Sequence, residues 1–188
     1  MQTYFRGNVN NMIGKMEHMS LHALKEGINK DYYELIKLIS KHIKEYSEYI
    51  KLKQHEPYSQ TIAKQCEALA DMAHTYVTNR INTYLPYLDE LTDKEATGHD
   101  CATCSGRCDA QHSIKLLEFT ASLNEIKKTF RQLKTSVLQE YKEHSRALKI
   151  LIDEIILLDD IINELFCIEE EQLLPGIKSA QNNIHARS

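Results

Sequence analysis

The feature that most constrains this chain is its shortage of residues that interrupt a helix. The stretch from Ser113 to Leu174 contains neither glycine nor proline, and the whole chain of 188 residues has only six glycines and three prolines. Because these two residues are the strongest breaks in regular structure, long helices joined by few turns are expected. We therefore predict an all-α fold, an up-down helical bundle of four or more long helices.

Start and stop signals place the helix boundaries. The three helices expected in the first half span residues 3–25, 29 or 31 to 55, and 59–91. Gly27 is expected to end the first, Pro57 to follow the second, and Pro86 to kink the third. The stretch 113–174 is too long for one ordinary helix, so we expect a break within it, near Lys142 to Ser145.

The segment between the two helical halves has a different composition. Residues 93–112 are polar and then rich in cysteine, and such a long connection in a helical protein is expected to be functional. We predict a single helical-bundle domain over residues 1–180, with halves 1–92 and 113–180 joined by this loop. Residues 181–188 are predicted to be a frayed tail.

Cysteine and histidine are concentrated in the loop. Cys101, Cys104, Cys108 and His112 have the spacing C-x2-C-x3-C-x3-H, with His99 just before them. Thiolates separated by two residues can bind one ion from a tight turn, and Cys108 and His112 share a helix face if a helix begins there. Four soft or borderline ligands in a compact loop favour tetrahedral zinc.

Other chemistry is compatible with the same ligands. An iron–sulfur cluster can be held by the three cysteines, with His99 or His112 as the fourth ligand. Cys101 and Cys104 can form a redox pair, made reactive by a helix N-terminus and Arg107. Unliganded thiols are the remaining interpretation. Clustered cysteines in a chain with no recognisable secretion signal favour metal or redox chemistry in a reducing, cytoplasmic setting.

Four polar residues are predicted to face the helical core. His42 falls at the centre of an apolar stripe formed by Leu35, Leu38, Ile39, Tyr46 and Tyr49. His144 continues the stripe of the helix that follows the loop, with Glu140 on its flank, and Glu169 lies among apolar residues near the C-terminus. A buried carboxylate requires a cation or hydrogen bonds. These four residues form a predicted core metal site, and a hydrogen-bonded histidine without metal is the alternative.

The C-terminal segment from Leu165 to Pro175 resembles the closing motif of the hemerythrin-like (HHE cation-binding) family. The matching positions are Glu169, Glu170, Leu173, Leu174 and Pro175, while Leu165 stands where the family has histidine. Lys142-Glu143-His144 resembles the start of a ligand helix in that family. The resemblance implies a four-helix bundle with a carboxylate/histidine non-haem iron site, acting in oxygen or nitric-oxide sensing, iron handling or repair.

Together these features predict a metal-binding, hemerythrin-like helical-bundle protein that uses zinc or iron and has a sensing or redox role. The alternative is a non-enzymatic regulatory or protein-interaction module in which zinc staples the Cys loop. In either case we expect a metal ion and a protein partner or second copy to bind. The sequence has no nucleotide-binding loop and no nucleophile motif, so whether the chain is an enzyme stays open.

Charge and hydropathy argue against two other classes of partner. The net charge of −4 is mild and no Lys/Arg block occurs, so nucleic-acid binding is not indicated. The most apolar stretch, from Ile150 to Phe166, contains carboxylates such as Asp153 and Asp159. These would be costly in lipid, so no membrane span is expected.

Overall fold

The computed structural model describes residues 19–99, 107–142 and 145–185, with backbone alone at 107–109 and 185. Every regular element in these residues is helical, so the predicted all-α class is confirmed. The elements are α2 (Leu21–Ile28), η1 (Asn29–Tyr33), α3 (Glu34–Lys53), α4 (Pro57–Asn79), η2 (Arg80–Tyr84), α5 (Leu85–Thr97), α6 (Arg107–Glu140), α7 (Arg146–Ile168), η3 (Glu169–Leu173) and α8 (Leu174–His185). The three η elements are π-helical turns. None of the described helices is both long and apolar enough to cross a membrane.

The chain divides into two compact units, each built from segments far apart in sequence. Unit 1 contains Met1–Asn29, Ile81–Leu123 and Glu164–Ser188, and unit 2 contains Lys30–Arg80 and Asn124–Asn163. Each unit therefore takes segments from both sides of the predicted 93–112 loop. The Cys loop belongs to unit 1.

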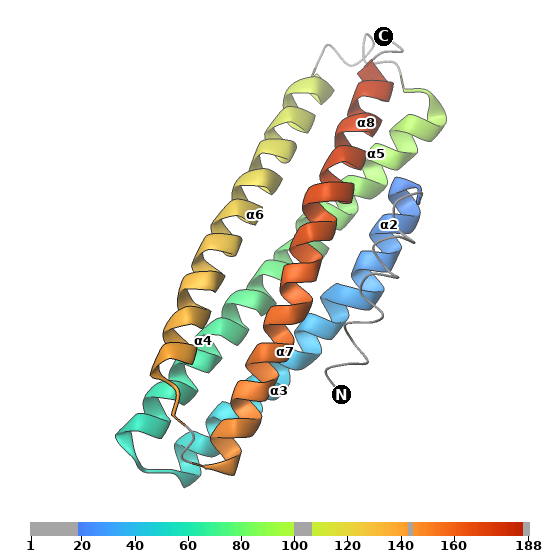
Figure 1. Ribbon diagram of the computed structural model, residues 1–188. Helices are drawn as coiled ribbons and strands as arrows, with labels where there is room; N and C mark the ends of the chain where they lie inside the picture. The colour runs from blue at the N-terminus through green and yellow to red at the C-terminus, as the bar shows by residue number, and fades with distance from the viewer. Residues whose placement is uncertain (1–18, 100–106, 143–144, 186–188) are drawn as a thin grey trace. The chain divides into compact units, whose positions relative to one another are not determined.

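Unit 2 contains a helical hairpin of α3 and α4, which lie side by side and antiparallel (Figure 1). Most buried positions of both helices recur at alternating spacings of four and three residues, which is the heptad pattern of coiled-coil packing. The residues in this pattern are Ile36, Ser40, Ile43, Ser47 and Ile50 in α3, and Ser59, Ala63, Cys66, Ala70, Ala73 and Val77 in α4. Ile39, Ile62, Leu69 and Tyr76 are buried beside them. Serine and alanine at many of these positions leave room for the two backbones to approach closely.

The predicted break in the second half of the chain is confirmed. Helix α6 ends at Glu140 and α7 begins at Arg146. The connection is held against the α3–α4 turn: the Tyr58 hydroxyl donates to the carbonyl oxygens of Glu140 and Lys142, each at 3.1 Å. Nearby, Gln54 Nε2 donates to Ser145 Oγ at 2.9 Å. These bonds bring the two connections together at one end of unit 2.

Two predicted helix ends are wrong. The helix continues through Gly27 into η1 and α3, because Ile28, Tyr32 and Tyr33 directly beyond it are buried and keep the chain helical. The third helix does not end near residue 91 but reaches Thr97. It ends where Gly98 adopts the left-handed conformation, with φ at 65°, that glycine tolerates best.

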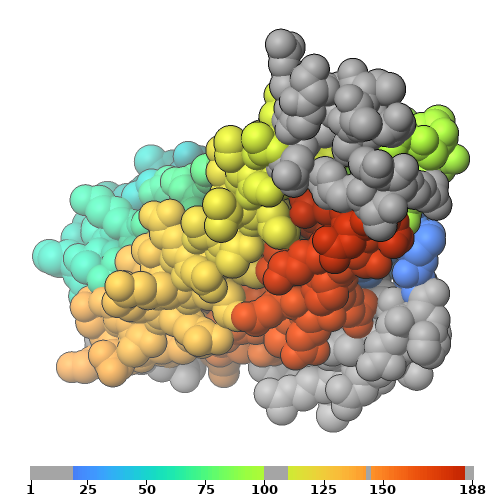
Figure 2. All heavy atoms as spheres, turned by 90° about the horizontal axis from the view of Figure 1, so that it is seen from above, coloured from blue at the N-terminus to red at the C-terminus, as the bar shows by residue number. Residues whose placement is uncertain are grey.

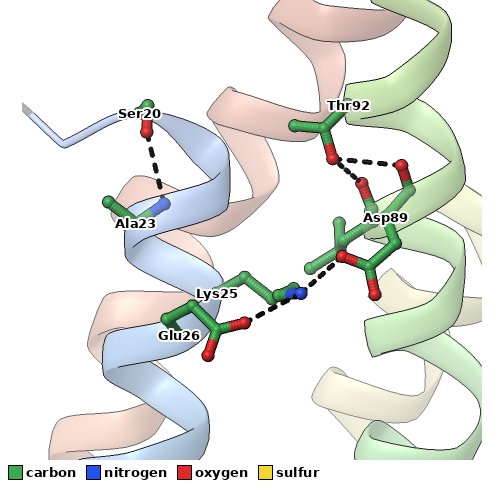
Figure 3. Close-up of polar contacts among 7 residues, drawn as sticks. Ser20, Ala23, Lys25, Glu26, Asp89 and Thr92 are labelled. Carbon is green, nitrogen blue, oxygen red and sulfur yellow. Dashed lines mark hydrogen bonds and ion pairs between the residues drawn. The ribbon is translucent and has the colours of Figure 1, made fainter.

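A buried ammonium group links α2 to α5 within unit 1 (Figure 3). Lys25 is only 7% exposed and forms ion pairs with Glu26, at 2.9 Å, and with Asp89 of α5. Burial by itself lowers the pKa of Lys25, but the hydrogen bonds to Asp89 and Glu26 and the charges of both carboxylates outweigh it, so the net pKa is raised above 10.5. At the start of the same helix, Ser20 Oγ accepts from the Ala23 N–H at 3.2 Å as an N-cap.

Candidate functional site

Both ends of the cysteine-rich loop are anchored in unit 1. His99 directly follows the left-handed Gly98, and its N–H donates to the carbonyl oxygen of Lys94 at 3.0 Å. At the other end α6 begins at Arg107, so Cys108 lies in the first turn of a helix and His112 one turn later. The helix required for Cys108 and His112 to share a face is therefore present. Cys101, Cys104 and the Cys108 side chain lie outside the described part of the chain.

His112 is the predicted ligand whose surroundings are best defined. Its side chain is 2% exposed, and the ring of Tyr87 from α5 meets it edge-on at 5.9 Å between centroids. Lys94 Nζ lies 3.5 Å from His112 Nε2. Gln181 Nε2 donates to the Tyr87 hydroxyl at 2.7 Å and to the His112 carbonyl oxygen at 3.1 Å. One buried amide from α8 thus holds α5 and α6 together, and Figure 2 shows the start of α6 beside α8.

The charges around His112 define how its imidazole can act. A lysine ammonium has three donors and no acceptor, so a hydrogen bond between Lys94 Nζ and His112 Nε2 requires that Nε2 carry no proton. Metal ligation requires an imidazole nitrogen without a proton. A metal ion held by Nε2 would take the place of the Lys94 contact, which at 3.5 Å is long, and Lys94 would keep its ion pair with Glu90. Burial raises the pKa of Tyr87, and the hydrogen bond from Gln181 offsets part of that rise.

The donor set of the loop fits a metal ion. Three thiolates and one imidazole supply four soft or borderline donors, which is a ligand set typical of zinc. Gln181 fixes the backbone of His112 by donating to its carbonyl oxygen, and Tyr87 packs against the imidazole ring. Among the described residues, unit 1 thus provides one candidate ligand, His112, and the side chains that hold it in place.

The predicted core site is not assembled by the described residues. His42 is exposed on α3, and Glu140 is exposed at the end of α6, where it accepts hydrogen bonds from Gln65 at 2.9 Å and Ser136 at 3.3 Å. The prediction that these two side chains face the core is wrong. In α3 the row from Ile36 to Ile50 is buried in place of His42, and Glu140 lies on an exposed part of α6. His144 lies outside the described residues. Across residues 19–99, 107–142 and 145–185 no group of three or more His, Cys, Asp or Glu side chains could hold a metal ion.

Glu169 is the one predicted core residue that the structure places in the interior. It is fully buried in the π-helical η3. A carboxylate in the interior is costly without compensating hydrogen bonds or a cation, so Glu169 requires one or the other at this position.

Sequence reasoning missed the three residues that surround His112. Lys94 follows Leu91 at helical spacing on the buried side of α5 that also carries Tyr87, so extending that helix by one turn would have found it. Gln181 follows Ile177 by four residues and is buried. The prediction that the chain frays from residue 181 is wrong, because α8 continues to His185.

Comparison with protein-family models, with curated proteins and with solved structures gives no match to this chain.

Proposed function

We propose that this chain is a metal-stapled, non-enzymatic protein-interaction module with zinc bound at one end of unit 1. The ligands are Cys101, Cys104, Cys108 and His112, with His99 beside them. The observation that carries the proposal is the position of His112: it is buried one turn after Cys108, in a helix that begins inside the cluster. Tyr87, Lys94 and Gln181 hold it there.

The number and type of ligands favour a structural role. Four protein ligands fill the tetrahedral coordination of zinc and leave no open position for water or substrate, whereas catalytic zinc sites keep one open. The loop joins α5 to α6, so a metal there would fix the ends of two helices relative to each other. The proposal includes an up-down arrangement of four long helical stretches, which are α2 to α3, α4 to α5, α6 alone, and α7 to α8.

A second candidate function is hemerythrin-like iron binding with an oxygen-sensing, nitric-oxide-sensing or redox role. Glu169 favours it, because this residue occupies a matching position of the family's closing motif and is fully buried. For this function, His144 and Glu169 remain candidate iron ligands. The exposure of His42 and Glu140 makes it the weaker of the two.

Metal analysis of anaerobically purified protein separates the two. We would measure metal content and the visible spectrum of the wild type and of the Cys101→Ala/Cys104→Ala variant. Cys167→Ala is the matched control, because Cys167 is an exposed thiol on α7. Colourless protein with one zinc per chain, lost in the double variant and kept in the control, supports the stapled module.

The other outcomes have distinct meanings. Iron with a visible band that disappears in the double variant would place a cluster in the loop. Iron that is retained in that variant would place it among the helices and support the hemerythrin-like function. Protein without any bound metal would overturn both proposals.

A further inference from the structure

Helix α3 of unit 2 presents a second apolar face that the rest of the described chain leaves exposed. Leu38 is 50% exposed, Tyr46 37%, Tyr49 52% and Leu52 73%. We define the α3 face as Leu38, Lys41, His42, Glu45, Tyr46, Glu48, Tyr49 and Leu52, all of which are exposed. Apolar and charged side chains alternate along this face.

A groove runs along one edge of this face. Tyr46 and Tyr49 line it from α3, Ala147 and Ile150 from α7, and its volume is about 610 Å³. Glu45 and Arg146 supply one charge of each sign at its border. Aromatic side chains beside a groove, with charges at the rim, are the composition of a protein-binding surface.

The apolar area of the face comes close to the lower limit for a specific dimer. From their exposed fractions, the four apolar side chains present on the order of 450 Å² per chain, within the range of the largest patch on a typical monomer. Two copies of the face together approach about 1000 Å², the lower limit of a specific interface. The polar residues of the face would add to that area as a rim.

The order of residues along the face is self-complementary. Leu38 and Leu52 each lie seven residues from Glu45, so an antiparallel pairing centred on Glu45 places Leu38 of one copy against Leu52 of the other. The spacing 38, 45, 52 is a heptad repeat, which keeps such a seam in contact. The same pairing brings Lys41 close to Glu48 of the second copy, twice by symmetry.

Like charges at the centre of this pairing are already compensated. Two copies of Glu45 would meet at the symmetry axis, but Lys41 Nζ lies 3.7 Å from Glu45 Oε1 on the same helix. Arg146 at the groove border adds a second cation. A face with both signs of charge and apolar ends suits a copy of itself better than a partner of uniform charge.

We propose that the α3 face is a homodimer interface, in which α3 packs antiparallel against α3 of a second copy with Leu38 against Leu52 and Lys41 against Glu48. This interface is independent of the metal site proposed above. The association should be reversible and in the micromolar range, because the area lies at the lower limit for specific binding.

Sedimentation velocity of the full chain tests the proposal, from about 1 µM to about 100 µM. We expect the wild-type mass to rise from monomer to dimer over this range and Leu52→Asp to remain a monomer. Leu117→Asp is the matched control, because Leu117 of α6 is exposed to nearly the same extent, 70%. Far-ultraviolet circular dichroism of each variant shows that the helices are retained.

Charge reversal tests the register. Lys41→Glu and Glu48→Lys should each weaken dimerisation by about three- to tenfold, and the two together should restore it to near the wild-type value. A wild-type chain that stays monomeric, a dimer unaffected by Leu52→Asp, or a double variant that fails to recover would each overturn the proposal. A dimer lost in Leu117→Asp instead would place the interface on α6 and overturn it as well.

Discussion

Replacing Ser40 or Ser47 of α3 by alanine should stabilise this protein, although both serines are completely buried. Each occupies a heptad position between isoleucines, and neither hydroxyl has a hydrogen-bond partner among the described residues. A buried polar group without a partner has lost its water and gained nothing in return. Alanine keeps nearly the same volume and removes the hydroxyl.

The size of the effect can be worked out from two contributions. Leaving a buried polar group unsatisfied costs about 1–3 kcal/mol, and alanine is a better helix former than serine by up to about 0.7 kcal/mol. The small void left by the oxygen offsets part of this. We therefore expect each variant to raise the free energy of unfolding by about 1 kcal/mol. The two sites are two helical turns apart, about 10 Å, so the double variant should gain about 2 kcal/mol, or roughly 4–8 °C in Tm.

Urea denaturation followed by circular dichroism at 222 nm measures this change, with the slope m expected to stay constant. Ser179→Ala on the exposed side of α8 is the control for helix propensity alone and should gain less. Ser20→Ala should have the opposite sign and lose about 1 kcal/mol, because it removes the N-cap to Ala23. If Ser40→Ala and Ser47→Ala destabilise the protein, or gain no more than Ser179→Ala, the hydroxyls are satisfied in solution and the reasoning is refuted.

Three other buried groups make separate predictions. Burial raises the pKa of Cys66 to about 12, so iodoacetamide at about pH 8 should label Cys167 and spare Cys66 in the native protein. Peptide mass spectrometry maps the labelled residues, and early labelling of Cys66 would contradict its burial. The folded pKa of Lys25 lies above 10.5, so its ion pairs stabilise the protein fully below that pH, and this stabilisation is lost as the pH rises through the folded value. Asp89→Asn should lower the free energy of unfolding by less than about 1 kcal/mol at pH 7 and reduce the loss of stability at alkaline pH. Urea titrations at several pH values measure both effects, and an unchanged alkaline profile would count against the ion pair. Gln181→Leu should weaken zinc binding about tenfold in competition with a chromophoric chelator, and unaltered affinity would show that the amide does not support the ligand.

The helical class and one of the connections could be predicted because they depend on local signals. The absence of glycine and proline between Ser113 and Leu174 predicted long helices there, with one break. The break observed between Glu140 and Arg146 falls where a polar stretch interrupts the apolar repeat. The buried position of Glu169 followed from helical periodicity in the same way. These features need no information about distant segments of the chain.

The surroundings of the loop site could not be predicted because they come from three separate helices. Cys108 and His112 are neighbours on one helix, and their spacing was readable once a helix was assumed to begin at Arg107. Lys94 and Gln181 reach His112 only through the packing of α5 and α8 in unit 1. Neither residue type signals a metal site on its own.

Proline positions offer a signal for the π-helical turns that the sequence analysis did not use. The turns η2 and η3 are each followed by Leu-Pro, at Pro86 and Pro175. A proline ring clashes with the carbonyl group four residues earlier, here Asn82 and Glu171, and both of these lie inside a π turn. A wider turn can move that carbonyl aside while the helix continues. Leu-Pro within an otherwise helical stretch therefore indicates a π turn as well as a kink.

The misplacement of His42 follows from the remaining π turn. Extending the buried positions of α2, Leu24 and Ile28, at ordinary helical spacing gives residues 35, 39, 42, 46 and 49, which, apart from Leu38, make up the stripe predicted to face the core. Of these, only Ile39 is buried in α3; the other buried residues are 36, 40, 43, 47 and 50, each one position after a member of the predicted stripe. A π turn adds one residue to the helical repeat, and η1 lies between the two helices. One residue rotates the helix by about 100°, which is enough to carry His42, Tyr46 and Tyr49 from the core to the surface. The same turn that removes His42 from the core thus creates the exposed α3 face.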